Sequence, residues 1–191
     1  MNRTIYLAGW GYVAVCAIAL ARRGPARSGE PPAPAVAFGG SGAAWFAPIK
    51  PFCNAVEVDV RQQQLPAPAG TEGAGFSAAC YALAGKIERA QEVIDRLDPP
   101  DRSEAAGIVF NVGHPVADAG DDQSAGPIMR LVVEYQPDNY MALYHAGMSE
   151  YILGQPDLAR RHLEDFLRRY LSDDGWRSNA LDVLRRLPSG R

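Results

Sequence analysis

The sequence predicts an all-α protein in which paired helices follow an apolar N-terminal helix and a spacer. Three observations carry this prediction. An uncharged apolar run fills residues 4–21, residues 24–70 are rich in proline, glycine and alanine, and residues 71–191 place apolar side chains at helical spacing with glycine at regular intervals. We therefore divide the chain into segments 1–23, 24–70 and 71–191.

Composition limits the function before any motif is considered. The chain has 191 residues, of which 47% are apolar and 21% charged, and its net charge is −3. That length suits one domain with appendages, and the apolar content suffices for a packed core. The pI of about 5.6 argues against nucleic acid as a partner. Three cysteines are too few for a zinc ribbon or a disulfide-dense scaffold.

The apolar run at residues 4–21 predicts a membrane segment. As a helix it would measure about 27 Å, close to the roughly 30 Å hydrocarbon core of a bilayer. We favour an uncleaved single-span anchor. The alternatives are a cleaved signal peptide, with Ala19-Leu20-Ala21 as its cleavage site, and a buried core helix.

Two arguments about the side of the membrane disagree. The arginines that follow the run, Arg22, Arg23 and Arg27, favour a cytoplasmic body. A very short N-terminal tail before an apolar run is instead the usual layout of an export signal, and we favour a periplasmic or other extracytoplasmic body. There Cys53 and Cys80 could form a disulfide. The alternative is two small buried apolar side chains.

Residues 24–70 predict a tether, because they contain eight of the fifteen prolines and show no clear periodicity. The alternative is a chain draped over the domain or over a neighbouring subunit. Within this segment, residues 52–64 are ambiguous. Val56, Val58 and Val60 alternate as in a strand, whereas Phe52, Val56 and Val60 would form one helical stripe. We favour a helix that packs on the helices after it.

One pattern then recurs three times, with starts at Thr71, Ala106 and Tyr140 that are 35 and 34 residues apart. Each unit has a small residue at its eighth position, a glycine at its fifteenth and a small residue at its twentieth. These residues are Ala78, Gly85 and Ala90, then Gly113, Gly120 and Ala125, then Gly147, Gly154 and Ala159. Small residues let two helices approach closely, and glycine permits a turn with positive φ.

This pattern resembles the tetratricopeptide repeat, a pair of antiparallel helices. The resemblance implies about three stacked hairpins, and an ordinary helical bundle is the alternative. A capping helix should follow Asp173 or Asp174, with an apolar stripe formed by Trp176, Ala180, Leu181, Leu184 and Leu187. The middle unit departs from the family pattern, because Pro115 falls inside its first helix and should kink or shorten that helix.

No catalytic motif or cofactor fingerprint occurs in the sequence, and we predict a protein that is not an enzyme. The nearest candidate for a metal or acid–base site is His114 with Asp118, Asp121 and Asp122. Their spacing matches no familiar ligand pattern, so we expect a solvated turn without a metal rather than an enzyme site. His162, among Arg160, Arg161 and Glu164, is expected on an exposed charged face.

The family binds partners on the face formed by the first helix of each hairpin. Carried over to this chain, the resemblance implies a groove formed by Phe110, Asn111, His114, Asp118, Met141, Tyr144, His145, Met148, Tyr151 and Ile152. Aromatic and methionine side chains suit the burial of a protein surface. The alternative is that some of them pack against another part of the chain, such as residues 38–52. Only Asn111 matches the family's carboxylate clamp, so that activity is not implied.

We therefore expect a non-catalytic, membrane-anchored module that binds other protein subunits, as an adaptor, assembly factor or accessory subunit of a larger membrane complex. The alternative is a soluble periplasmic or secreted repeat protein that binds a peptide or an envelope component after signal cleavage.

Overall fold

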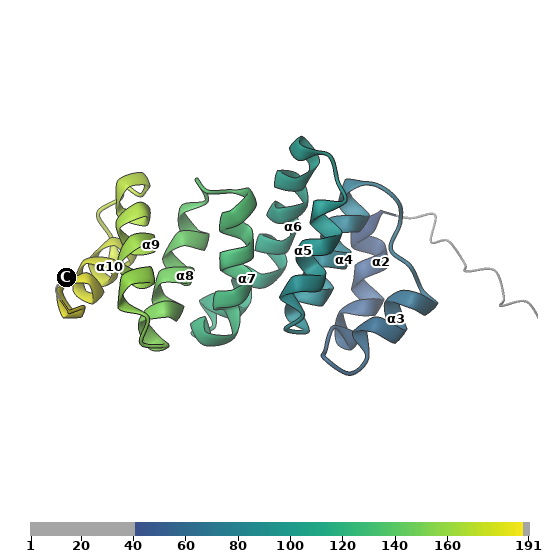
Figure 1. Ribbon diagram of the computed structural model, residues 1–191, viewed down its shortest axis with the longest axis horizontal. Helices are drawn as coiled ribbons and strands as arrows, with labels where there is room; N and C mark the ends of the chain where they lie inside the picture. Colours follow the sequence, from purple (N-terminus) through teal and green to yellow (C-terminus); the bar gives the residue numbers. More distant parts are fainter. Residues whose placement is uncertain (1–40, 189–191) are drawn as a thin grey trace, which may run out of the picture. The chain divides into compact units, whose positions relative to one another are not determined.

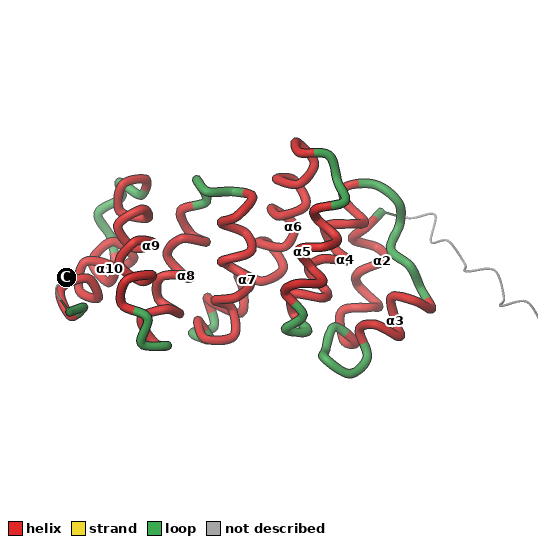
Figure 2. Tube along the Cα trace, in the orientation of Figure 1, coloured by secondary structure: helices red, strands yellow, loops and turns green. Residues whose placement is uncertain are grey.

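The computed structural model describes residues 41–188, and every regular element in this range is a helix (Figure 2). The predicted all-α class is therefore confirmed for this part of the chain. The apolar run at residues 4–21 and the first part of the predicted tether lie outside the described residues. Within 41–188, no helix is both long enough and apolar enough to cross a bilayer.

Six consecutive helices form three hairpins (Figure 1). They are α4 (Thr71–Leu83) with α5 (Ile87–Asp95), α6 (Pro99–Asp118) with α7 (Asp122–Tyr135), and α8 (Tyr140–Ile152) with α9 (Pro156–Arg169). Each hairpin turns at the glycine that the spacing predicts, with φ of 73° at Gly85, 90° at Gly120 and 68° at Gly154. Side chains with a Cβ are strained at such φ values, so glycine defines these turns.

The two helices of each hairpin touch through the small residues of the pattern. All six small residues at the eighth and twentieth positions are buried. In the last hairpin, a Cβ added to Gly147 would lie 2.7 Å from Cγ of Leu163. Gly113 contacts Ile128 of α7 in the same way, with a separation of 2.8 Å from Cγ2. The spacing in the sequence therefore corresponds to real helix contacts.

The hairpins do not stack uniformly. The first joins the second mainly through α4 and α6, whereas the second joins the third through α7 and α8. One apolar core extends from α4 to α8 around Ile94, Val109 and Met129, and a second joins α8, α9 and α10 (Gly175–Arg186) around Leu163 and Phe166. The second hairpin therefore uses its first helix on one side and its second helix on the other.

The first helix of the middle unit, α6, begins at Pro99 rather than near Ala106 and continues through Pro115 to Asp118. Pro115 was expected to kink or shorten this helix, and it does not shorten it. Proline removes the amide that would bond to the carbonyl of residue 111, four positions earlier. Asn111 is exposed, so water can bond to that carbonyl instead. Pro99 suits the first turn of the helix, where its missing amide would have no helical partner.

The region between residues 41 and 65 differs from the predicted tether. It forms α2 (Gly42–Ile49), a short 3-10 helix η1 (Lys50–Phe52) and α3 (Val58–Gln64). Trp45, Phe46 and Ile49 are buried in a third apolar cluster against α4, and the Trp45 indole donates a 3.0 Å hydrogen bond to the carbonyl of Leu65. Bulky apolar side chains therefore hold this proline-rich stretch on the helical domain.

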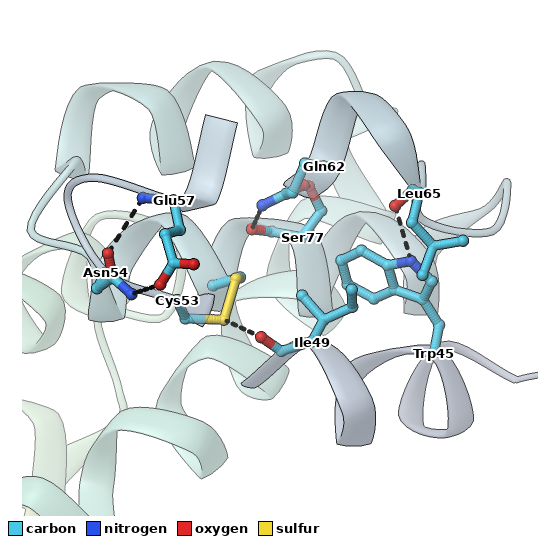
Figure 3. Close-up of a disulfide and its surroundings, with 9 residues drawn as sticks. Trp45, Ile49, Cys53, Asn54, Glu57, Gln62, Leu65 and Ser77 are labelled. Carbon is cyan, nitrogen blue, oxygen red and sulfur yellow. Dashed lines mark hydrogen bonds between the residues drawn. A yellow bond between two sulfur atoms is a disulfide. The ribbon is translucent and has the colours of Figure 1, made fainter. Parts of the chain in front are cut away.

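Residues 58–64 form the favoured helix, but they bury another stripe than the one expected. Val58 is fully buried, and Gln62 bonds to the backbone and side chain of Ser77 on α4 (Figure 3). Val56, which was expected on the packing stripe, is 85% exposed. The helix starts at Val58, so Val56 lies in the preceding turn and does not follow the helical register.

The C-terminal helix α10 follows Asp174, whose carboxylate accepts hydrogen bonds from the amides of Trp176 and Arg177. This is one of the two predicted starts. Ala180, Val183 and Leu187 form its buried stripe, whereas Leu181 is partly exposed. The acceptor side chain satisfies amides that the helix start leaves without a partner.

Candidate functional site

The candidate site lies where α6 and α8 face each other. We define the α6–α8 face as Phe110, His114 and Asp118 on α6 with Met141 and His145 on α8, all of which belong to the predicted groove. On α6 these residues are four positions apart, and on α8 they are also four apart, so each set follows one side of its helix. The face has a hollow at one end and a cluster of polar side chains at the other.

The hollow has a volume of about 600 Å³ and opens beside the turn between α7 and α8. Phe110 and Met141 contribute to its lining, and the other lining residues are Ser103, Tyr135, Gln136, Pro137, Asp138, Asn139 and Tyr140. Gln136 holds this turn against α6 by donating a 2.7 Å hydrogen bond to the carbonyl of Ser103. Apolar rings and polar side chains thus border the same cavity, which suits a ligand with both kinds of surface.

The ring of Phe110, which lines the hollow, stacks on His114 of the polar cluster with 4.7 Å between centroids. Asp118 Oδ1 lies 3.4 Å from Nε2 of His114 and 3.7 Å from Nε2 of His145. The other ring nitrogen of His145, Nδ1, is 2.7 Å from Oδ1 of Asp122 in the first turn of α7. Two imidazoles and two carboxylates therefore meet where three helices converge.

Burial sets the electrostatics of this cluster. Partial burial lowers the pKa of His114 below its usual value, because desolvation disfavours the charged ring; Asp118 opposes the shift and His145 adds to it. Burial also raises the pKa of the neighbouring Tyr144 phenol. His114 is therefore held toward its neutral form, with a lone pair on one ring nitrogen.

The sequence predicted that His114, Asp118, Asp121 and Asp122 lie together in a solvated turn. In the structure, Asp121 has a different role from the other three. Asp121 caps α7 by accepting a hydrogen bond from the amide of Ser124. Asp118 and Asp122 instead approach His145, which comes from the next hairpin. Because the partners of His145 come from two other helices, spacing along the chain carries no signal for this cluster.

The remaining predicted groove residues do not form one open surface. Tyr144 is buried, and its hydroxyl accepts a 2.5 Å hydrogen bond from Asn179 of α10. Met148 also contacts Asn179, and Tyr151 packs against the second apolar core. Ile152, at the end of α8, is 53% exposed, and Asn111 is exposed on α6. The segment that covers part of α8 is thus α10, whereas residues 42–49 pack on α4.

The expectation of an exposed charged face at His162 is wrong. Nδ1 of His162 lies 2.7 Å from Oε2 of Glu150, whose side chain is fully buried. Glu150 is the eleventh residue of the unit that starts at Tyr140, where the tetratricopeptide repeat has an apolar residue in its first helix. A charged residue at a position that faces the partner helix is the one signal that could have indicated this pair.

Cys53 and Cys80 form a disulfide (Figure 3). It joins the residue after η1 to α4, and both half-cystines are buried within the third apolar cluster. This bond closes a loop with a sequence separation of 27 residues and attaches the first helices to the hairpins covalently.

No protein-family model, no curated protein and no solved structure matches this chain. The tetratricopeptide resemblance therefore remains a prediction from the residues, and the site must be interpreted from its own chemistry.

Proposed function

We propose that this chain is a non-catalytic interaction module of tetratricopeptide type, held at a membrane by residues 4–21 and binding another protein subunit. It would act as an adaptor, assembly factor or accessory subunit of a membrane complex. The observation that supports binding is the hollow of about 600 Å³ on the α6–α8 face. Its size and mixed lining suit one large side chain of a partner together with the adjoining backbone.

The chemistry of the lining indicates which kind of segment would enter. Phe110, Tyr140 and Met141 offer apolar surface, and the thioether of Met141 can adapt to irregular shapes. The exposed carboxylate of Asp138 lies at the same hollow and accepts a 3.0 Å hydrogen bond from Nε of Arg169. We therefore expect a partner segment that inserts an apolar anchor into the hollow.

The disulfide supports an extracytoplasmic location for the helical domain. Disulfides persist in oxidising compartments and are rare in the cytosol. The Cys53–Cys80 bond is buried and joins two elements that pack on each other, so it belongs to the fold. Together with the apolar run at residues 4–21, it favours a membrane-attached periplasmic or external domain.

The binding proposal is tested by purification of the chain in mild detergent and identification of the proteins that elute with it. The Met141→Lys variant should lose a partner that the wild type retains, because a charged side chain would enter the hollow. Val56→Lys is the matched control, since Val56 is exposed and lies on another part of the domain. If both variants retain the same proteins as the wild type, the hollow is not the binding site.

The anchor is tested separately by the intact mass of the membrane-extracted protein. A full-length chain of 20.6 kDa is expected. A chain that begins at Arg22 would exclude the anchor and favour the alternative, a soluble periplasmic or secreted protein that binds a peptide or an envelope component.

A further inference from the structure

We propose that His114, Asp118 and His145 bind one divalent transition-metal ion, with zinc as the best fit. This site goes beyond partner binding and does not depend on it. The chain has three histidines, and two of them belong to this cluster. One potential ligand atom from each of the three residues lies within 4.8 Å of the other two.

Two of the three distances between the ligand atoms are close to those of tetrahedral coordination, and the two imidazole nitrogens lie within 4.8 Å of each other. Zinc binds imidazole nitrogen and carboxylate oxygen at about 2.0–2.1 Å, so two ligands in a tetrahedral site lie roughly 3.4 Å apart. The carboxylate of Asp118 is 3.4 Å from Nε2 of His114 and 3.7 Å from Nε2 of His145. Small movements of the side chains would bring all three atoms to bonding distance of one ion.

A second observation also points to a ligand at this place. The His145 side chain is only 2% exposed, and its Nε2 has no hydrogen-bond partner among residues 41–188. Nε2 of His114 is likewise buried and without a hydrogen bond in the described part of the chain. Buried polar atoms are costly when they are unpaired. A shared metal ion would satisfy both nitrogens at once.

Asp122 prepares His145 for this role. The 2.7 Å contact between Nδ1 of His145 and Asp122 places the ring proton on Nδ1, which leaves the lone pair on Nε2. A carboxylate that holds the second nitrogen of a metal-binding histidine is the usual support for such a ligand, because it fixes both the tautomer and the ring orientation.

Aromatic neighbours hold the two imidazoles in place. Phe110 stacks on His114, and the rings of Tyr144 and Trp176 meet His145 edge to face at 5.1 and 5.7 Å. Ligands that are fixed before the ion arrives lose little freedom when it binds. The site therefore has defined ring positions rather than a set of mobile surface side chains.

The donor set selects the class of metal. Two imidazole nitrogens and one carboxylate suit zinc and its neighbours in the transition series, whereas calcium and magnesium prefer oxygen ligands alone. Asp118 is partly exposed, so solvent reaches this side of the cluster. The fourth tetrahedral position is then available to a water molecule.

The test uses the full chain without a histidine tag, in mild detergent, stripped with a chelator and titrated with zinc chloride alone. The wild type should bind one zinc ion per chain. His114→Ala and Asp118→Asn should each weaken binding by about tenfold or more, and Asp122→Asn should weaken it by about 10- to 100-fold through the loss of its support for His145. Asp101→Asn, the same substitution at the other end of α6, should bind zinc like the wild type.

Folding is checked by circular dichroism and by thermal unfolding without metal. Zinc should raise the unfolding temperature of the wild type and of Asp101→Asn, but not that of His114→Ala. If one variant fails to fold, the other ligand variant decides the question. The proposal is overturned if the wild type binds no stoichiometric zinc, or if the folded ligand variants bind it as tightly as the wild type.

Discussion

Each of the three histidines of this chain faces a carboxylate. His114 faces Asp118, His145 faces Asp122, and His162 faces Glu150, with 2.7 Å between the paired atoms in the last two cases. The pair of His162 and Glu150 is not part of the α6–α8 face. It joins α8 to α9 inside the last hairpin, and its fully buried carboxylate makes it a structural contact with a large effect on stability.

Removal of His162 should therefore destabilise the protein strongly. Among residues 41–188, Oε2 of Glu150 bonds to His162 and Oε1 has no hydrogen-bond partner. The His162→Ala variant would therefore leave the buried carboxylate of Glu150 without any hydrogen bond from these residues. We expect the free energy of unfolding to fall by about 3 kcal/mol. Chemical denaturation monitored by circular dichroism measures this change.

Two controls separate the pair from a general effect of substitution in α9. Arg161→Ala, at an exposed neighbour, should change the free energy of unfolding by less than about 0.5 kcal/mol. In a Glu150→Gln background, His162→Ala should cost less than it does alone, since a neutral amide is easier to bury than a carboxylate. Equal costs in the two backgrounds would contradict an interaction between these residues.

Single residues divide into those that the sequence could reveal and those it could not. The small residues at the helix contacts and the turn glycines were predictable, because their role depends on spacing along one chain. The pairing of His145 with Asp118 and Asp122 was not predictable. It depends on how three helices are placed in space, and no motif of fixed spacing records that placement.

Among the elements, the last hairpin provides the sharpest test of helix packing. A Cβ at residue 147 would lie 2.7 Å from Cγ and 2.9 Å from Cδ2 of Leu163, and 3.3 Å from the backbone nitrogen of Leu163. Leu163 is fully buried in the second apolar core, so it has little space into which it can move. Gly147→Ala should therefore push α8 and α9 apart and lower the free energy of unfolding by about 1–3 kcal/mol.

Gly175→Ala is the matched comparison for this prediction, because a Cβ there meets no atom within 4 Å. That substitution should leave the free energy of unfolding unchanged or raise it by up to about 1 kcal/mol, since alanine has fewer conformations in the unfolded chain. Thermal unfolding of the two variants measures the contrast. A Gly147→Ala protein as stable as the wild type would show that α8 and α9 are not in close contact at this point.

Two helices were harder to predict from the sequence, because the prolines in them suggest a loop or a tether. The helix α2 contains Pro48 and lies in the proline-rich stretch, so the predicted tether extended over it. Its buried residues Trp45, Phe46 and Ile49 occupy only two turns, which is too short for a clear period. The early start of α6 was missed for a related reason, since Pro99 and Pro100 suggest a loop although proline suits the first turn of a helix.

At the scale of the whole molecule, the first helices and the hairpins form one unit through apolar packing and one covalent bond. Trp45 and Val58 pack with the disulfide of Cys53 and Cys80 in the third apolar cluster. A disulfide stabilises a fold chiefly by restricting the unfolded chain, and a loop of this length corresponds to about 3–4 kcal/mol. Reduction should therefore weaken the whole domain and not only its first helices.

The redox state of this pair also connects the fold to the location of the protein. If thiols are blocked at the moment of cell lysis and the protein is then mapped by mass spectrometry, the peptides with Cys53 and Cys80 should stay unlabelled until a reductant is added. Reductant should lower the free energy of unfolding of the wild type by about 3–4 kcal/mol, but should leave a Cys53→Ala/Cys80→Ala variant unaffected. Labelling of both cysteines before reduction would contradict an extracytoplasmic domain, because a buried disulfide in an oxidising compartment has no free thiol to label.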